Sequence, residues 1–95
     1  MIRRSDLTEV DIQDWCRQYL AQLLKRAPES IDRNADFDSL GLDSAESVFL
    51  VSALEEWSRV QLPPEAAIEH PSVIRLSQFV FRTSVTGGGA PPTRW

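Results

Sequence analysis

The fold is decided by residues 37–48, which read Phe-Asp-Ser-Leu-Gly-Leu-Asp-Ser-Ala-Glu-Ser-Val. This stretch predicts a turn that opens a helix, with Gly41 supplying conformational freedom just before it. Asp43 can act as the N-cap, and Glu46, three residues later, completes a capping-box pattern. Ser44 then falls in the first helical turn, where its hydroxyl is expected at the surface near the positive end of the helix dipole.

The overall composition is that of one small, acidic, globular domain. The chain has 95 residues, with 42% apolar residues, 25% charged residues and a formal net charge of -4. This charge argues against nucleic-acid binding, which needs a basic face, and suits partner proteins with basic surfaces. We expect a monomer.

The sequence also bears on the cellular compartment. It has one cysteine, Cys16, so no disulfide can form within the chain. No apolar run approaches the roughly 20 residues of a membrane span, and no apolar segment of a signal peptide follows the N-terminal arginines. We therefore expect a cytoplasmic protein that does not bind membranes.

Apolar residues recur at spacings of three and four after Thr8, which predicts a first helix of about four to five turns. Thr8, with Asp11 three residues later, is the candidate start, and Pro28 is expected to stop the helix. Residues 28–43 have no period and are predicted as a long loop. Its spaced apolar residues favour an ordered loop over a core; they are Ile31, Phe37, Leu40 and Leu42.

A second helix is predicted from Asp43 to about Arg59, with Leu54 at the centre of its buried face. At 100° per residue, Ser47, Leu50, Val51, Trp57 and Ser58 share that face, whereas Ala45, Val48, Phe49 and Ser52 point elsewhere. An exposed apolar strip on a small domain often marks a partner surface, although packing under the loop is the alternative.

The C-terminal third predicts one short and one longer helix. Residues 65–69 follow two prolines and form a short helical turn, and Ser72 caps a last helix that runs to about Arg82. Residues 1–7 are interpreted as a flexible lead-in and residues 84–95 as a flexible Gly/Pro tail. The fold class is therefore all-α: a small four-helix bundle with three longer helices, one short helix and a long ordered loop.

Other residues that could carry chemistry have simpler explanations. His70 lies in a proline-flanked turn, and Cys16 lies on the apolar stripe of the first helix, where a buried structural thiol is expected. One histidine and one cysteine give no metal-ligand spacing. Glu55 and Glu56 are adjacent and cannot face each other as an acid/base pair, so they predict an acidic surface patch. Trp57 is expected to pack in the core.

The stretch Leu40-Gly41-Leu42-Asp43-Ser44 resembles the Gly-x-Asp-Ser signature of acyl carrier proteins and peptidyl carrier domains. The resemblance extends over residues 8–82, with a Pro28 stop and a His70-Pro71-Ser72 segment in the expected order. It implies a carrier domain at residues 8–83 and no catalytic residue or metal site of its own. It also implies that Ser44 carries covalent 4'-phosphopantetheine, which holds acyl groups as thioesters in polyketide or related natural-product or lipid biosynthesis.

The resemblance further implies the partners. A phosphopantetheinyl transferase would modify Ser44 using coenzyme A and magnesium. An acyl-AMP ligase or acyltransferase would load the arm, and a ketosynthase or another condensing or tailoring enzyme would use the cargo. The predicted partner face combines apolar and acidic residues, namely Asp43, Ala45, Glu46, Val48, Phe49, Glu55 and Glu56.

Several positions depart from the family's commonest pattern. Ala45 stands where Leu or Ile is usual, and Phe49 stands where an acidic residue is frequent. These differences concern the choice of partner more than the modification. Trp57 resembles carriers that are charged by fatty-acyl-AMP ligases. Two alternatives stay open: a peptidyl carrier of aminoacyl groups, and a helical adaptor in which Ser44 is never modified.

Overall fold

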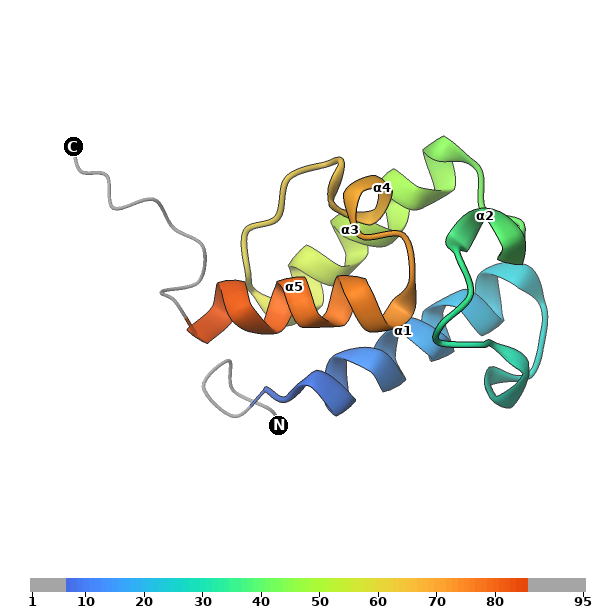
Figure 1. Ribbon diagram of the computed structural model, residues 1–95, viewed down its shortest axis with the longest axis horizontal. Coiled ribbons are helices and arrows are strands. Elements are labelled where there is room, and N and C mark those ends of the chain that lie inside the picture. The colour runs from blue at the N-terminus through green and yellow to red at the C-terminus, as the bar shows by residue number, and fades with distance from the viewer. Residues whose placement is uncertain (1–6, 86–95) are drawn as a thin grey trace.

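The computed structural model describes residues 7–85, which form helices and connecting segments without a β-strand (Figure 1). The elements are α1 (Glu9–Leu24), the 3-10 turn η2 (Pro28–Ser30), α2 (Phe37–Leu40), α3 (Ser44–Ser58), α4 (Ala66–Glu69) and α5 (Val73–Val85). Helices α1, α3 and α5 are the long ones, as expected. In Figure 1, α5 lies alongside α1, and the short α4 lies beside α3. The all-α bundle is confirmed.

Helix α1 begins as its sequence predicts. The Thr8 side chain accepts a hydrogen bond from the Asp11 N–H, and the Asp11 carboxylate accepts one from the Thr8 N–H. The predicted end at Pro28 is wrong, because α1 stops at Leu24. Lys25 adopts a left-handed conformation (φ 58°), and the N–H groups of Lys25 and Arg26 both donate to the Ala21 carbonyl. This ends the helix before the proline is reached.

The connection between α1 and α3 is ordered, but it is not purely a loop, because it contains η2 and α2. All four of its predicted apolar anchors are buried; they are Ile31, Phe37, Leu40 and Leu42. The backbone is also tied to the last helix region, since the Phe37 N–H donates to the Pro71 carbonyl and the Ile74 N–H to the Arg33 carbonyl. Its short helical elements also satisfy backbone groups locally, since the Ile31 N–H donates to the Pro28 carbonyl and the Gly41 N–H to the Asp38 carbonyl.

Helix α3 has the predicted bounds and buried face. Its buried residues are Ser47, Leu50, Val51, Leu54 and Ser58, and Arg59 ends it in a left-handed conformation. Trp57 is half-buried and stacks on Trp15, with ring centroids 5.3 Å apart. The prediction that Trp57 packs against the core is confirmed. On the other side of α3, Val48 and Phe49 are 38% and 60% exposed among the residues that the structure describes.

The ends of the described chain differ from the predicted boundaries. Leu7, which was assigned to the flexible lead-in, is buried in the core. Helix α5 continues to Val85, three residues beyond its predicted end, so residues 84 and 85 belong to the helix and not to a tail. The rest of the predicted lead-in and tail lies outside the described residues. Within residues 7–85, no helix has the length and apolar character that crossing a bilayer requires.

Candidate functional site

Ser44 is the first residue of α3, and its surroundings follow from the turn before it. Asp43 caps the helix: its carboxylate accepts a hydrogen bond from the Glu46 N–H (2.8 Å), and the Glu46 carboxylate accepts one from the Asp43 N–H (3.1 Å). The predicted capping box is confirmed. Gly41 ends α2 at φ 104°, a conformation that favours glycine and lets the chain reverse into α3. Because Asp43 and Glu46 supply the cap, the exposed Ser44 hydroxyl is not needed for it.

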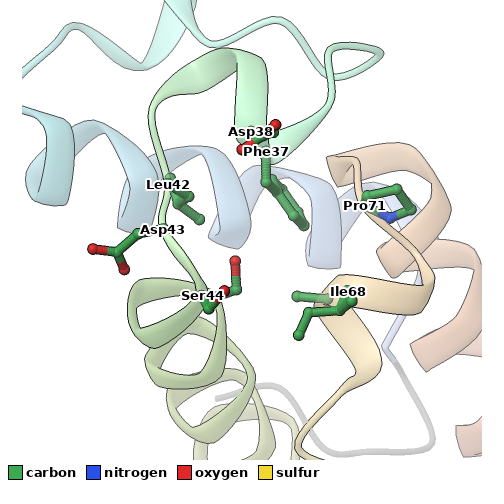
Figure 2. A pocket seen from close by; sticks show the side chains of 9 residues that line it. Phe37, Asp38, Leu42, Asp43, Ser44, Ile68 and Pro71 are labelled. Carbon is green, nitrogen blue, oxygen red and sulfur yellow. The ribbon is translucent and has the colours of Figure 1, made fainter.

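Ser44 borders an open pocket of about 430 Å³ between α2, α3 and α4 (Figure 2). Apolar side chains form much of the lining, and the Asp43 carboxylate points away from Phe37 and Ile68 in this view. The lining residues are Phe37, Asp38, Leu42, Asp43, Ser44, Ser47, Ala67, Ile68 and Pro71. The hydroxyl therefore stands where a polar surface meets an apolar hollow.

Ile68 was missed as a site residue in the sequence. It is 56% exposed although its neighbours Ala66 and Ala67 are buried. The signal that could have found it is local: in a single helical turn, two alanines on the packed side leave the next large apolar residue facing outward. Its position across the pocket from Ser44 depends on how α4 packs against α3, and no local pattern shows that.

The part of the chain around Ser44 is strongly acidic. Residues 34–74 contain a single basic residue, Arg59, against eight carboxylates: Asp36, Asp38, Asp43, Glu46, Glu55, Glu56, Glu65 and Glu69. The remaining nine arginine and lysine residues lie in the other segments of the chain. The charge is thus concentrated in the segments that make α2, α3 and α4, and a basic protein surface approaching Ser44 would be attracted.

The predicted partner face divides into exposed and structural members. Ala45, Phe49 and Glu56 are exposed, with Phe49 60% and Val48 38% accessible. Glu55 differs from Glu56, because it is half-buried and its carboxylate accepts a hydrogen bond from the Leu62 N–H at 3.0 Å. Glu55 therefore holds the segment that follows α3, whereas Glu56 faces outward.

The other two candidate reactive side chains, Cys16 and His70, are held in packing contacts. Cys16 is fully buried between α1 and α5, and burial raises the pKa of its thiol to about 12, with the nearby Ser77 hydroxyl opposing the shift. The Ser77 hydroxyl has no partner of standard hydrogen-bond geometry within residues 7–85. The His70 ring stacks on Phe79 with centroids 4.4 Å apart. The structural interpretations of both residues are confirmed.

Among the described residues, no group of three or more His, Cys, Asp or Glu side chains is arranged to hold a metal ion. Despite their number, the carboxylates around α3 are spread along the surface. The residues that the structure brings together are Ser44, its cap and the apolar pocket. That arrangement can present one hydroxyl to an incoming enzyme, with an apolar hollow beside it.

Comparison with known proteins identifies the family. Residues 14–80 match the family model described as phosphopantetheine attachment site. The chain is 36% identical over 74 residues to the acyl carrier protein TtuC of Teredinibacter turnerae, which covers 78% of this chain and 85% of that protein. It is also 36% identical over 67 residues to the phenolphthiocerol synthesis polyketide synthase type I Pks15/1 of Mycobacterium marinum, covering 70% of this chain and 3% of that protein.

The fold agrees with this similarity. The NMR structure of the HMG-ACPI domain from the CurA module of Lyngbya majuscula superposes with a TM-score of 0.75 and 20% identity, covering 93% of this chain and 86% of that one. The matched family segment includes the turn, the cap and the whole of α3. The chain therefore belongs to the acyl carrier protein family, whose cofactor is covalently attached 4'-phosphopantetheine.

Proposed function

We propose that the Ser44 hydroxyl is the attachment point of 4'-phosphopantetheine, and that the chain is a carrier without catalytic activity of its own. The observation that supports this most directly is the position of Ser44: exposed, first in α3 and beside the pocket. In the part of the chain that the structure describes, the two other candidate nucleophilic or basic side chains, Cys16 and His70, are held in packing contacts.

The residues around Ser44 fit the proposed group. A phosphodiester on the Ser44 oxygen would carry its negative charge at the N-terminus of α3, where the helix dipole favours an anion. The Asp43 carboxylate accepts a hydrogen bond from the Glu46 N–H and points away from Phe37 and Ile68 (Figure 2). The apolar lining, including Leu42 and Ile68, offers contacts to an uncharged arm. When bound, the group supplies a terminal thiol on which acyl cargo is held as a thioester.

This chain's own contribution is to present, orient and dock. The cap keeps Ser44 at a rigid helix start, so a phosphopantetheinyl transferase meets a hydroxyl in a fixed place. Tethering then gives each partner enzyme a high effective concentration of cargo. The proposed later partners are an acyl-AMP ligase or acyltransferase that loads the arm, and a ketosynthase or other condensing or tailoring enzyme. We predict that the carrier is cytoplasmic and monomeric and that it acts in polyketide or related biosynthesis.

The proposed docking face comprises the predicted partner residues on the exposed side of α3, with Asp43 and Glu46 at its start. Phe49 is the large apolar member, and Glu56 is an outward-facing acid. Partners must release the carrier after each step, which requires a small interface with charge steering and not a tight one. The absence of basic residues from 34 to 58 supports steering toward a basic partner surface.

The attachment is tested by intact mass after incubation with coenzyme A, Mg²⁺ and a broad-specificity phosphopantetheinyl transferase. We expect wild-type protein to gain one phosphopantetheine, and Ser44→Ala to gain none. Ser39→Ala is the matched control, because Ser39 is an exposed serine on α2 that does not line the pocket. A wild type that gains no mass, or a Ser44→Ala variant that does, would overturn the attachment site.

The docking face is tested by transfer kinetics on correctly folded variants. Phe49→Ala and Glu56→Lys should each slow acyl transfer to and from the modified carrier without changing helical circular dichroism. Val10→Ala is the control, because Val10 is a 58% exposed apolar residue on a different helix, α1. Unchanged transfer rates in both α3 variants would remove this face from the proposal.

A further inference from the structure

Helices α2 and α5 are each capped by the segment that precedes the other. The first four N–H groups of a helix have no partner within that helix. The N–H of Phe37, the first residue of α2, donates to the Pro71 carbonyl at 2.7 Å. The N–H of Ile74, the second residue of α5, donates to the Arg33 carbonyl at 3.1 Å. We call these two hydrogen bonds the cross-cap.

The cross-cap forms part of the wall of the pocket beside Ser44. Phe37 and Pro71 both line that pocket, on the side away from Asp43 (Figure 2). The Phe37 residue is also bonded to the turn before Ser44, since its carbonyl accepts a hydrogen bond from the Leu42 N–H at 3.0 Å. Leu42 lies two residues before Ser44. A shift of Phe37 is therefore transmitted to Ser44 through one backbone hydrogen bond and a short length of chain.

A contact between two side chains ties the cross-cap to α1. Arg33, whose carbonyl takes part in the cross-cap, donates from Nη1 to Oε1 of Gln13 at 2.7 Å. Both residues are half-buried, and a hydrogen bond from a charged donor partly shielded from water is stronger than one between neutral groups. The two residues are 20 positions apart in the chain, so the contact depends on the folded bundle. Arg33 thus holds α1 through its side chain and α5 through its carbonyl, just before α2 begins.

The segment between Arg33 and Phe37 is short and locally ordered, so it can pass on this restraint. Asp32 organises a turn here: its carboxylate accepts from the Asn34 N–H at 2.9 Å, and its carbonyl accepts from the Ala35 N–H at 3.2 Å. Ala35 packs against the core. A restraint applied at Arg33 is therefore felt at Phe37, the residue that lines the pocket.

We propose that the Gln13–Arg33 contact fixes the α2 wall of the pocket, and that both residues are positioning residues for the modification of Ser44. Neither residue lines the pocket, so they act on Ser44 through the cross-cap and Phe37. Their effect is on where the hydroxyl lies, and a displacement of about 1 Å in a reacting group can cost on the order of a hundredfold in rate. This inference rests on the proposed attachment at Ser44.

Steady-state kinetics with the broad-specificity phosphopantetheinyl transferase and coenzyme A test the positioning role, with the carrier as the varied substrate. Gln13→Leu keeps the size of the side chain but removes the acceptor, and should lower kcat about fivefold or more with KM within about twofold of wild type. Gln13→Glu keeps an acceptor for Arg33 and should retain most of the wild-type kcat. Gln18→Leu is the matched control and should behave as wild type, because Gln18 is an exposed glutamine on the same helix.

Two further measurements separate positioning from a general loss of stability. Arg33→Met should lower kcat as Gln13→Leu does, and the double variant should be no slower than either single variant, because all three lose the same contact. In unmodified protein, Gln13→Leu should accelerate hydrogen exchange of the Phe37 and Ile74 amides more than that of the Leu54 amide, which reports on opening of the core. The exchange measurement needs no transferase, so it tests the restraint independently of the attachment site.

Three results would overturn the inference while leaving the attachment at Ser44 intact. The first is a Gln13→Leu variant that matches Gln18→Leu in kcat. The second is a Gln13→Leu variant whose KM rises at unchanged kcat, which would place Gln13 in a docking surface. The third is equal acceleration of exchange at all three amides, which would mean that the contact adds only to overall stability. A wild type that gains no phosphopantetheine would instead overturn the attachment site, and with it the positioning role.

Discussion

Two regions of this small bundle each hold a nucleophilic side chain, and their environments are opposite. Ser44 is exposed at the start of α3, at the edge of an open pocket. Cys16 is fully buried where α1 packs on α5, and its thiol pKa is raised to about 12 by that burial. An ionised cysteine sulfur is a stronger nucleophile than a serine hydroxyl. At this buried site, however, reagents cannot reach the Cys16 sulfur and the thiol stays protonated.

Under the proposed attachment at Ser44, placement and not intrinsic reactivity selects the residue that is modified. An ordinary hydroxyl at a capped helix start can be reached by an enzyme that supplies the activation. A thiol without solvent access stays protonated and serves as a small apolar residue of the core. Because the buried Cys16 thiol is unreactive, it does not take up acyl groups in competition with the arm proposed on Ser44.

The largest expected effect contrasts the accessibility of the two regions. In native protein, Cys16 should react with a thiol-disulfide exchange reagent about a thousandfold or more slowly than in urea-unfolded protein, because reaction requires opening of the core. The control is Ser52→Cys in a Cys16→Ala background, which places a thiol on the exposed side of α3 and should react at nearly the unfolded rate. Native Cys16 labelling within tenfold of that control would contradict the buried assignment.

The second effect compares side chains on opposite faces of α3. Leu54→Ala should lower the free energy of unfolding by about 2–5 kcal/mol, because it removes a fully buried side chain and leaves a cavity. Phe49→Ala should change it by no more than about 0.5 kcal/mol, since Phe49 is exposed. Urea unfolding followed by circular dichroism measures both. A large loss in Phe49→Ala would mean that this ring supports the fold and is not reserved for partners.

The third effect is the pH dependence that burial imposes on Cys16. Its pKa rises from 9.0 to about 12 on folding, so between these values the unfolded chain releases a proton that the native state keeps. Stability from this group is complete below pH 9 and falls as the pH rises toward 12. At pH 10 the free energy of unfolding of the wild type should be about 1 kcal/mol lower than at pH 7, a loss that Cys16→Ala does not show. Parallel stability curves for both proteins would contradict the burial argument.

The smallest effect concerns the cap that holds Ser44 in place. Asp43→Ala removes the acceptor of the Glu46 N–H and should cost about 1 kcal/mol in the free energy of unfolding. Asp43→Asn keeps an acceptor at the same position and should cost less. Both are measured by thermal or urea unfolding of the unmodified protein. If Ala and Asn were equivalent, the cap would not be what orders the start of α3.

The accuracy of the sequence-based predictions followed the range of the interactions involved. The caps at Thr8 and Asp43 and the buried face around Leu54 were correct, because they depend on residues within one or two turns. The end of α1 was wrong, since a left-handed Lys25 closes the helix before Pro28, and lysine carries no strong signal for that conformation. Residues 28–43 were read as a loop. The start of α2 is tied to Pro71 through the Phe37 N–H, and the Arg33 carbonyl between η2 and α2 accepts from the Ile74 N–H, so both contacts come from far along the chain.

For the site itself, the sequence determined the chemistry: which serine opens a capped helix, which residues cap it, and that an acidic stretch without lysine or arginine surrounds it. These are local properties, set by backbone propensity and by residue type. Only the tertiary structure decided that Ile68 faces Ser44 across a pocket, and that Glu55 holds Leu62 while Glu56 faces solvent. Both depend on how the segment after α3 folds back, because adjacent residues on a helix acquire different roles only when another segment packs against one of them.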